Sequence, residues 1–303
     1  MAHPSDVAYA AHPSLRQPCM VLALDGWVDG GEAATGSVRF LRRKLRCRKL
    51  AEIPLGRFHV YQLPGQLALR PFTRVEEGLL TEYRPQRNVF HYWENPGGER
   101  DVILFQGTEP NLNWDDYVAA VLDVARTFGA TRIYMLGGVL DKTPHTREPG
   151  VSCVSTSLAL RDELLGLGIE PVNYEGPAGI RTALAAACQK TGMEMAILHV
   201  RATYYPEFNM VIGHNPKAIR ALVRRLVRLL GLQLDLGELD AESRDYEARI
   251  DHMALRNREF QTYLEALERE YVEPGPHDVP EFSAGEAVQA VEELLRGFSD
   301  DAA

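Results

Sequence analysis

The chain has 303 residues, of which 45% are apolar and 25% are charged, the proportions of an ordinary globular protein. A chain of this length buries enough surface to fold without disulfides or structural metals, so disordered, collagen-like and disulfide-scaffold classes are excluded. The formal net charge of −9 is unevenly distributed: residues 233–303 carry 19 acidic and 6 basic side chains, a net −13, and residues 1–232 carry +4. Such an acidic block is typical of a solvated helix or an interaction segment.

The cysteines and apolar runs bear on the cellular environment. No secretory apolar segment opens the sequence, and no apolar run approaches the roughly 20 residues that cross a bilayer. The cysteines form no C-x-x-C pair; they are Cys19, Cys47, Cys153 and Cys188. We therefore expect reduced thiols in a cytoplasmic protein that does not enter a membrane.

The N-terminal third mixes a buried strand with shorter strands. Residues 1–16 are polar and Ala-rich and are predicted to be disordered. Met20–Leu24 is a continuous apolar run of the kind that a buried parallel strand shows, and a glycine-rich turn and a helix from Glu32 follow it. Alternating apolar residues predict further strands at 50–54, 58–62 and 89–93.

From residue 100 onward, strands alternate with helices. Strands are predicted at 101–106, 132–136, 169–174 and 195–200, and helices at 114–128, 152–165, 178–189 and from Pro216. This rhythm predicts an α/β fold, a three-layer sandwich in which helices cover both faces of a mainly parallel mixed sheet. Residues 17–235 are expected to form this domain, and residues 236–303 an acidic helical extension.

The helix from Pro216 carries arginines opposite its apolar stripe. They are Arg220, Arg224, Arg225 and Arg228. Nucleic acid would be one target, but the chain has no aromatic interleaving, no binding motif and no basic excess. We therefore predict no nucleic-acid partner, and a solvated face or pairing with the acidic extension instead.

The extension contains a sustained heptad pattern with a single polar member. The seam steps by 4, 3, 4, 3, 4, 3, 4 through Tyr246, Ile250, Met253, Asn257, Phe260, Leu264, Leu267 and Tyr271. A buried Asn can set the register of paired helices, so one interpretation is a helical hairpin or coiled coil that recruits a partner or a second copy. The other is an ordinary helix packed back on the body. A last short helix is predicted at 282–295.

The usual catalytic signatures are missing. Gly31–Ser37 has the glycine spacing of a phosphate-binding P-loop without its Lys, and no G-x-G-x-x-G follows a strand. Ser152 lacks the second Gly of a nucleophile elbow, and the nine His show no H-E-x-x-H. We expect neither a cofactor nor a metal.

Polar residues nevertheless follow several predicted strands, where α/β sheets place their ligand sites. The candidate pocket consists of Asp25, Asp29, Glu109, Asn111, His145, Arg147 and Glu175. These side chains suit binding of a phosphate or sugar and movement of protons. Each of them is also a common helix cap or loop brace, so a structural role stays open for each.

Four of these loops together resemble a known family. Leu24–Ala34, Gly107–Pro110, Pro144–Arg147 and Glu175–Ile180 are similar in sequence, order and spacing to the proteasome assembly chaperone 2 family. The resemblance covers about residues 18–235. It implies a fold similar to purine nucleoside phosphorylases and related hydrolases, a helical appendage, and self-association with a trimer as the expected form. It does not imply catalysis.

Two functions are consistent with these patterns. The first is a non-enzymatic, self-associating protein-binding or assembly factor, as the resemblance implies. The alternative is a nucleosidase- or phosphorylase-like hydrolase, or a ligand sensor, that uses the strand-end loops.

Overall fold

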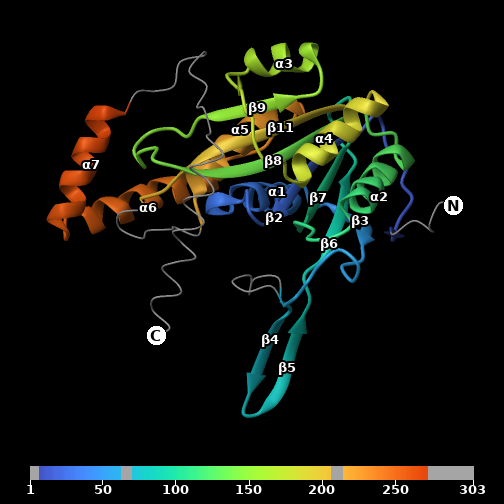
Figure 1. Cartoon of the computed structure of the whole chain (residues 1–303), viewed down its shortest axis with the longest axis horizontal. Coiled ribbons are helices and arrows are strands. Elements are labelled where there is room, and N and C mark those ends of the chain that lie inside the picture. The colour runs from blue at the N-terminus through green and yellow to red at the C-terminus, as the bar shows by residue number, and fades with distance from the viewer. Residues whose placement is uncertain (1–6, 63–69, 206–213, 272–303) are drawn as a thin grey trace.

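A central mixed sheet organises the molecule. The computed structural model describes residues 7–62, 70–205 and 214–271. Within them, nine strands form one sheet in the order β1-β3-β6-β7-β2-β8-β11-β9-β10 (Figure 1). The strands are β1 Ala8–Tyr9, β2 Cys19–Asp25, β3 Arg48–Ile53, β6 Asn88–Trp93, β7 Val102–Thr108, β8 Arg132–Asp141, β9 Val151–Ser155, β10 Glu170–Pro171 and β11 Glu194–Thr203.

The centre of the sheet is parallel and its flanks are largely antiparallel. Strands β7, β2, β8 and β11 run parallel to one another, whereas β1, β3, β6 and β9 join through antiparallel pairings. The predicted α/β fold with a mixed sheet is confirmed. The parallel part is the part that places strand ends, and so the loops that follow them, at a common edge.

Helices cover both faces because strand side chains alternate. Cys19, Val21 and Ala23 of β2 pack toward α1 and α5, and Met20, Leu22 and Leu24 pack toward α2 and α4. Burial on both faces explains the uninterrupted apolar run of β2. The helices are α1 Ala33–Lys44, α2 Trp114–Thr127, α3 Leu158–Leu165, α4 Ile180–Thr191 and α5 Pro216–Leu229.

The N-terminal segment is ordered over the described residues. β1 pairs antiparallel with β3, and the Tyr9 hydroxyl donates a 2.7 Å hydrogen bond to Asp123 of α2. The prediction of disorder over residues 1–16 is therefore wrong for residues 7–16, and residues 1–6 lie outside the described part. Tyr9 packs on α2, so tertiary contacts order a segment with little apolar patterning of its own.

The predicted helix at 152–165 is instead a strand followed by a shorter helix. The buried and exposed residues of β9 alternate from Val151 to Val154, and this strand pairs with β11. α3 begins after Ser157, whose hydroxyl accepts a 3.2 Å hydrogen bond from the Leu160 amide. That cap marks the true start of the helix.

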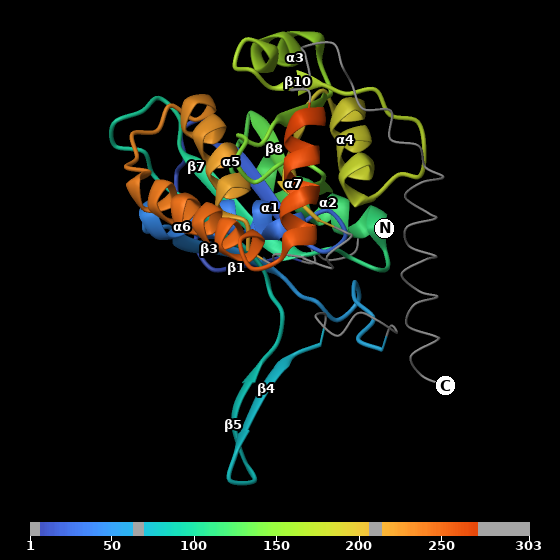
Figure 2. The same cartoon turned by 90° about the vertical axis from the view of Figure 1, so that its left-hand side faces the viewer.

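A two-stranded hairpin projects from the body. β4 Phe72–Glu76 and β5 Leu79–Arg84 pair only with each other as a sheet, and in both views they extend away from the α/β sandwich (Figure 1 and Figure 2). Glu77 and Gly78 join them with positive φ at both positions, the conformation of a tight hairpin turn. The sequence did not predict this hairpin, and the strand predicted at 58–62 is turn and loop.

The helical extension is two helices. α6 spans Gly237–Ala254 and α7 spans Arg258–Glu270. Asn257 interrupts the predicted continuous helix: its backbone is extended and its Oδ1 accepts hydrogen bonds of 3.1 Å from the amides of Glu259 and Phe260. Asn257 is thus a helix cap rather than a register-setting seam residue. The predicted helix at 282–295 lies outside the described residues.

Most of the seam packs against the chain's own body. Tyr246, Ile250, Phe260 and Leu264 are buried around Tyr205, which follows β11. The rings of Tyr205 and Phe260 lie 5.4 Å apart, edge to face. Leu267 packs on this cluster from α7, Tyr271 follows the helix end, and Met253 is exposed. We refer to α6 and α7 together as the arm.

Acidic side chains of the arm pair with basic side chains of the body. Glu238 accepts from Arg43 at 2.5 Å and lies 2.8 Å from the Lys44 ammonium. Asp240 accepts from Arg224 at 2.8 Å and lies 3.4 Å from Arg220. Of the two expectations for the α5 arginines, pairing with the acidic extension therefore holds for Arg220 and Arg224.

Candidate functional site

Three of the predicted pocket residues meet where β2 and β7 end. Asp25 closes β2, and its carbonyl accepts a 2.9 Å hydrogen bond from the Glu109 amide. The Glu109 carboxylate accepts a 3.0 Å hydrogen bond from the Trp27 amide. Because β2 and β7 are parallel neighbours, their C-terminal loops lie side by side and can exchange these bonds.

Asp29, in the same loop, caps helix α1. Its Oδ1 accepts from the amides of Ala34 at 2.8 Å and Thr35 at 3.2 Å, and its Oδ2 accepts from the Thr35 hydroxyl at 2.5 Å. Burial raises the pKa of Asp29 to about 6. The hydrogen bonds favour the ionised carboxylate and lower the pKa, but burial has the larger effect. All three bonds point into α1, so Asp29 has the structural role that the sequence left open.

Arg181 is the residue at this edge that the sequence did not single out. Its almost fully buried guanidinium donates to the carbonyls of Val28 at 3.1 Å and of Leu24 and Leu136 at 3.4 Å. Its Nη1 lies 4.0 Å from Glu109 Oε2. Burial lowers the pKa of Arg181, although an Arg side chain stays charged.

Through these contacts, Arg181 links helix α4 to the strands of the sheet. It joins the first turn of α4 to the end of β2, to the loop after β2 and to the middle of β8, with Glu109 as its counter-charge. No local pattern marks it, because it follows a Gly-Ile pair in an Ala-rich helix whose position depends on packing.

His199 of β11 is a further polar side chain near this edge, and it is half-buried. A Cβ at Gly137 on the adjacent strand would stand 2.6 Å from the His199 Cδ2, so glycine there makes room for the imidazole. Burial, with Arg181 nearby as a second cause, lowers the pKa of His199 to about 4. The imidazole is therefore neutral at pH 7.

His145 and Arg147 do not join this group, so the single predicted edge divides into two. The Tyr205 hydroxyl lies 2.8 Å from His145 Nδ1, and Asp251 of α6 lies 3.0 Å from its Nε2. Arg147 pairs with Glu268 of α7 at 3.0 Å. The loop between β8 and β9 thus contacts the arm.

The remaining two predicted pocket residues stand apart. The Asn111 Oδ1 accepts a 3.0 Å hydrogen bond from the Val60 amide and so braces a loop. Glu175 is exposed in the segment before α4. The structure thus brings Asp25, Asp29 and Glu109 together with the unpredicted Arg181, whereas the polar contacts of His145, Arg147 and Asn111 are with other segments.

A model of the PAC2 family matches residues 23–254, well over half of the chain. The chain belongs to the PAC2 family. The resemblance carried by the four loops is thereby confirmed.

Solved structures of PAC2 proteins have the same fold. The Mycobacterium tuberculosis proteasome-assembly chaperone homologue Rv2125 is 28% identical, with a TM-score of 0.70 over 81% of this chain and 99% of that one. A PAC2 family protein from Streptomyces avermitilis is also 28% identical, with a TM-score of 0.68 over 78% and 96%. Pyrococcus furiosus PbaB, an archaeal proteasome activator, shares the fold at 19% identity and a TM-score of 0.62 over 82% and 97%. No curated relative matches the chain.

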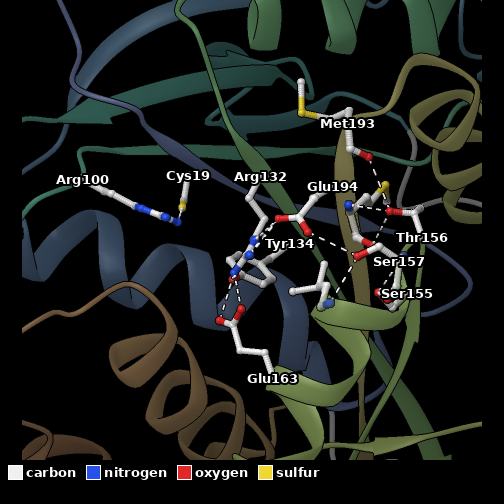
Figure 3. A network of polar contacts seen from close by, with 12 residues as sticks. Cys19, Arg100, Arg132, Tyr134, Ser155, Thr156, Ser157, Glu163, Met193 and Glu194 are labelled. Atoms are coloured by element: carbon white, nitrogen blue, oxygen red, sulfur yellow. Dashed lines mark hydrogen bonds and ion pairs between the residues drawn. The ribbon is translucent and has the colours of Figure 1, made fainter.

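A second polar network in this PAC2 protein lies at the opposite ends of the strands. At the start of β8, Arg132 donates to Glu194 at 2.7 Å and to Glu163 of α3 at 2.9 Å (Figure 3). Ser157 donates to Glu194 at 3.2 Å, and the Tyr134 hydroxyl lies 3.1 Å from Arg132. These charges are mutually satisfied, so the network braces α3 against the sheet.

Metal and thiol chemistry find little support in the described part of this PAC2 chain. Residues 7–62, 70–205 and 214–271 contain no group of three His, Cys, Asp or Glu that could hold a metal. The four thiols are unpaired, and burial raises the pKa of Cys47 to about 12 and of Cys153 and Cys188 to about 11. Such thiols are poor nucleophiles. No described helix is long and apolar enough to span a bilayer.

Proposed function

We propose that this PAC2 protein is a non-enzymatic, self-associating assembly factor that acts on protein partners in the cytoplasm. Two relatives support a role in protein assembly: one is described as a proteasome-assembly chaperone homologue and another as a proteasome activator. Within the chain, the observation that carries the proposal is the projecting hairpin.

The hairpin presents apolar side chains to solvent. Phe72, Val75, Leu79, Leu80 and Tyr83 are 43%, 60%, 69%, 66% and 64% exposed. Almost every residue of both strands is exposed, so the body does not cover this ribbon. Exposed apolar side chains gathered on one ribbon in this way mark protein contacts.

A second copy of the chain is the expected partner of the hairpin. A two-stranded hairpin is at best marginally stable in water unless something packs on it. Each copy carries the same ribbon, so exchange of hairpins around a closed ring would cover all of them at once. This arrangement supports a homo-oligomer, with a trimer as the form expected from the family resemblance.

The polar residues at the sheet edge support the non-enzymatic part of the proposal. Asp29 is engaged in capping α1, and Arg181 is engaged by three carbonyls and Glu109. His145 is buried between Tyr205 and Asp251. Groups committed to such bonds would have to break them before acting on a substrate.

The test is the mass of the protein in solution. The double variant Leu79→Asp, Leu80→Asp should shift the particle to the mass of one chain in light scattering coupled to gel filtration, because two carboxylates cannot be buried in an apolar contact. Leu158→Asp on α3 is the matched control: Leu158 is 70% exposed, like Leu79, but lies outside the hairpin. An unchanged mass for the hairpin variant would contradict the proposal.

A specific observation keeps the enzyme or sensor alternative testable. Asp25, Glu109 and Arg181 lie together at the ends of parallel strands, the usual ligand position in α/β sheets. If they form a site, nucleosides or phosphate should raise the melting temperature, and Glu109→Gln should remove the rise. Asn111→Asp is the control on the same loop. Absence of any rise leaves the assembly function as the better account.

A further inference from the structure

A groove of about 420 Å³ lies between helices α1, α5 and α6. Its floor is apolar, because Phe40, Ile219 and Leu239 meet there, one from each helix. A Cβ at Gly36 would stand 2.5 Å from the Ile219 Cδ1, so α1 and α5 approach closely at this point. A larger residue at position 36 would displace α5 and change the groove.

The rim of the groove carries three arginines of α1, and Glu242 and His214 also line it. The three arginines lie within four residues of one another and all line the groove: Arg39, Arg42 and Arg43. Arg39 pairs with Glu32 at 2.6 Å and Arg43 with Glu238 at 2.5 Å. Arg42 forms no ion pair with any residue in the described ranges, so one guanidinium of the rim is available to an anion.

The apolar floor and the basic rim together indicate which class of ligand this groove would bind. A helix with an apolar stripe flanked by carboxylates would satisfy both, as in helix-in-groove recognition. Nucleic acid is less suitable, because its binding is dominated by phosphate contacts that would leave the apolar floor unused. An acidic amphipathic peptide is therefore the matching chemistry.

The chain's own sequence contains such a peptide. In residues 281–296, Ala284, Val288, Val291 and Leu295 step by 4, 3 and 4, which predicts one apolar stripe on a helix. The acidic residues of this stretch are Glu281, Glu286, Glu292 and Glu293. These residues lie outside the described part of the chain.

The tether lets this peptide fold back along the arm toward the groove. Ten residue steps separate Tyr271 from Glu281, and an extended chain covers about 33 Å in that number of steps. The whole of α6, which forms one wall of the groove, is roughly 27 Å long at 1.5 Å per residue. We propose that the groove binds the acidic sequence 281–296 of the same chain, independently of the hairpin.

A photo-crosslinking amino acid in place of Val291, in the full-length protein, tests this proposal. Because Val291 belongs to the apolar stripe, irradiation should link it to peptides that contain Phe40 or Leu239. A mixture of isotopically light and heavy protein separates links within a chain from links between chains. Links to another part of the body, or mainly between chains, would overturn the proposal.

Charge reversal supplies the matched variants. Arg39→Glu with Arg42→Glu should lower the crosslink yield at least tenfold, and adding Glu292→Arg with Glu293→Arg should restore it. Restoration also shows that the reversed rim still folds. Arg126→Glu, at an exposed arginine of α2, is the control and should leave the yield unchanged. A crosslink yield that stays unchanged when the rim arginines are reversed would refute the proposal.

Discussion

Two appendages, the arm and the hairpin, extend from the same α/β body. The apolar side chains of the arm are buried, and those of the hairpin are exposed. The arm turns Tyr246, Ile250 and Phe260 inward onto Tyr205, whereas the hairpin leaves Leu79 and Leu80 in solvent. The arm has the regular heptad pattern that predicts an interaction surface, and the hairpin has no such pattern. Periodicity therefore identifies a face that needs covering, and only the packing shows whether the chain covers it itself.

The charged side chains of the arm, like its apolar ones, contact the body. Acidic residues of the arm meet basic residues of the body: Glu247 pairs with Lys217, which is almost fully buried, and Glu238 pairs with Arg43 and Lys44. Exposed pairs contribute little singly, up to about 1 kcal/mol each. Their number and common sign nevertheless orient the arm, so much of the charge asymmetry of the sequence is complementarity within one chain.

The largest expected effect is on the docking of the arm. Phe260→Ala removes a buried ring from the cluster around Tyr205 and should cost about 3 kcal/mol of unfolding free energy, as truncation of a core aromatic does. Urea unfolding gives the free energy, and hydrogen exchange of α6 and α7 shows whether the arm is the part that loosens. Leu255→Ala, at a residue 75% exposed, should change neither. Equal effects of the two variants would remove the contrast between arm and hairpin.

Acidification should act on the body before it acts on the arm. The pKa of His199 is about 4 in the folded chain because of burial, below its ordinary value of 6.5. The unfolded chain therefore takes up this proton first, and stability that is present above pH 6.5 is lost as the pH falls from 6.5 to 4. Each imidazole with such a shift should contribute about 2.5 kcal/mol of this loss, measured by urea unfolding across that range. His199→Gln should reduce it, and His91, whose pKa burial also lowers to about 4, accounts for part of the remainder.

The arm should respond in a lower pH window. Hydrogen bonds from Arg43 and Lys44 lower the pKa of Glu238 to about 2. The stability from this pair is present above the ordinary pKa of 4.5 and is lost as the pH falls toward 2. Hydrogen exchange of α6 should therefore rise below pH 4.5, and Glu238→Gln should make it independent of pH there. A rise that begins near pH 6 in the arm would contradict this order.

The smallest expected effect is confined to the hairpin turn. Gly78 has φ of +81°, so Gly78→Ala should cost about 1 kcal/mol of hairpin stability. We expect a several-fold weaker self-association, measured by sedimentation, with an unchanged melting temperature of the body. Gly97→Ala is the control, since Gly97 lacks a positive φ and a Cβ there would meet no atom within 4 Å. Equal self-association of the two variants would show that the hairpin does not form the contact.

The candidate site was predicted in part, and the reason lies in the topology. Asp25, Asp29 and Glu109 were expected together because they follow neighbouring parallel strands, and they lie together. Arg181 was missed, because its guanidinium reaches three carbonyls from segments far apart in the sequence. The hydrogen bonds of His145 go to Tyr205 and to Asp251 of the arm, and nothing within its own loop predicts these contacts.

The sandwich, the charge asymmetry and the family membership could all be predicted from the sequence. Those features rest on patterns that act within one helix or strand, such as the apolar run of β2 or the stripe of α5, or on residues quoted in order along the chain. Which apolar faces are buried and which are exposed could be seen only in the packing of the folded chain. Whether Phe260 or Leu79 is buried depends on what lies opposite, and Asn257 could occupy a seam or cap a helix until the packing around Tyr205 favoured the cap.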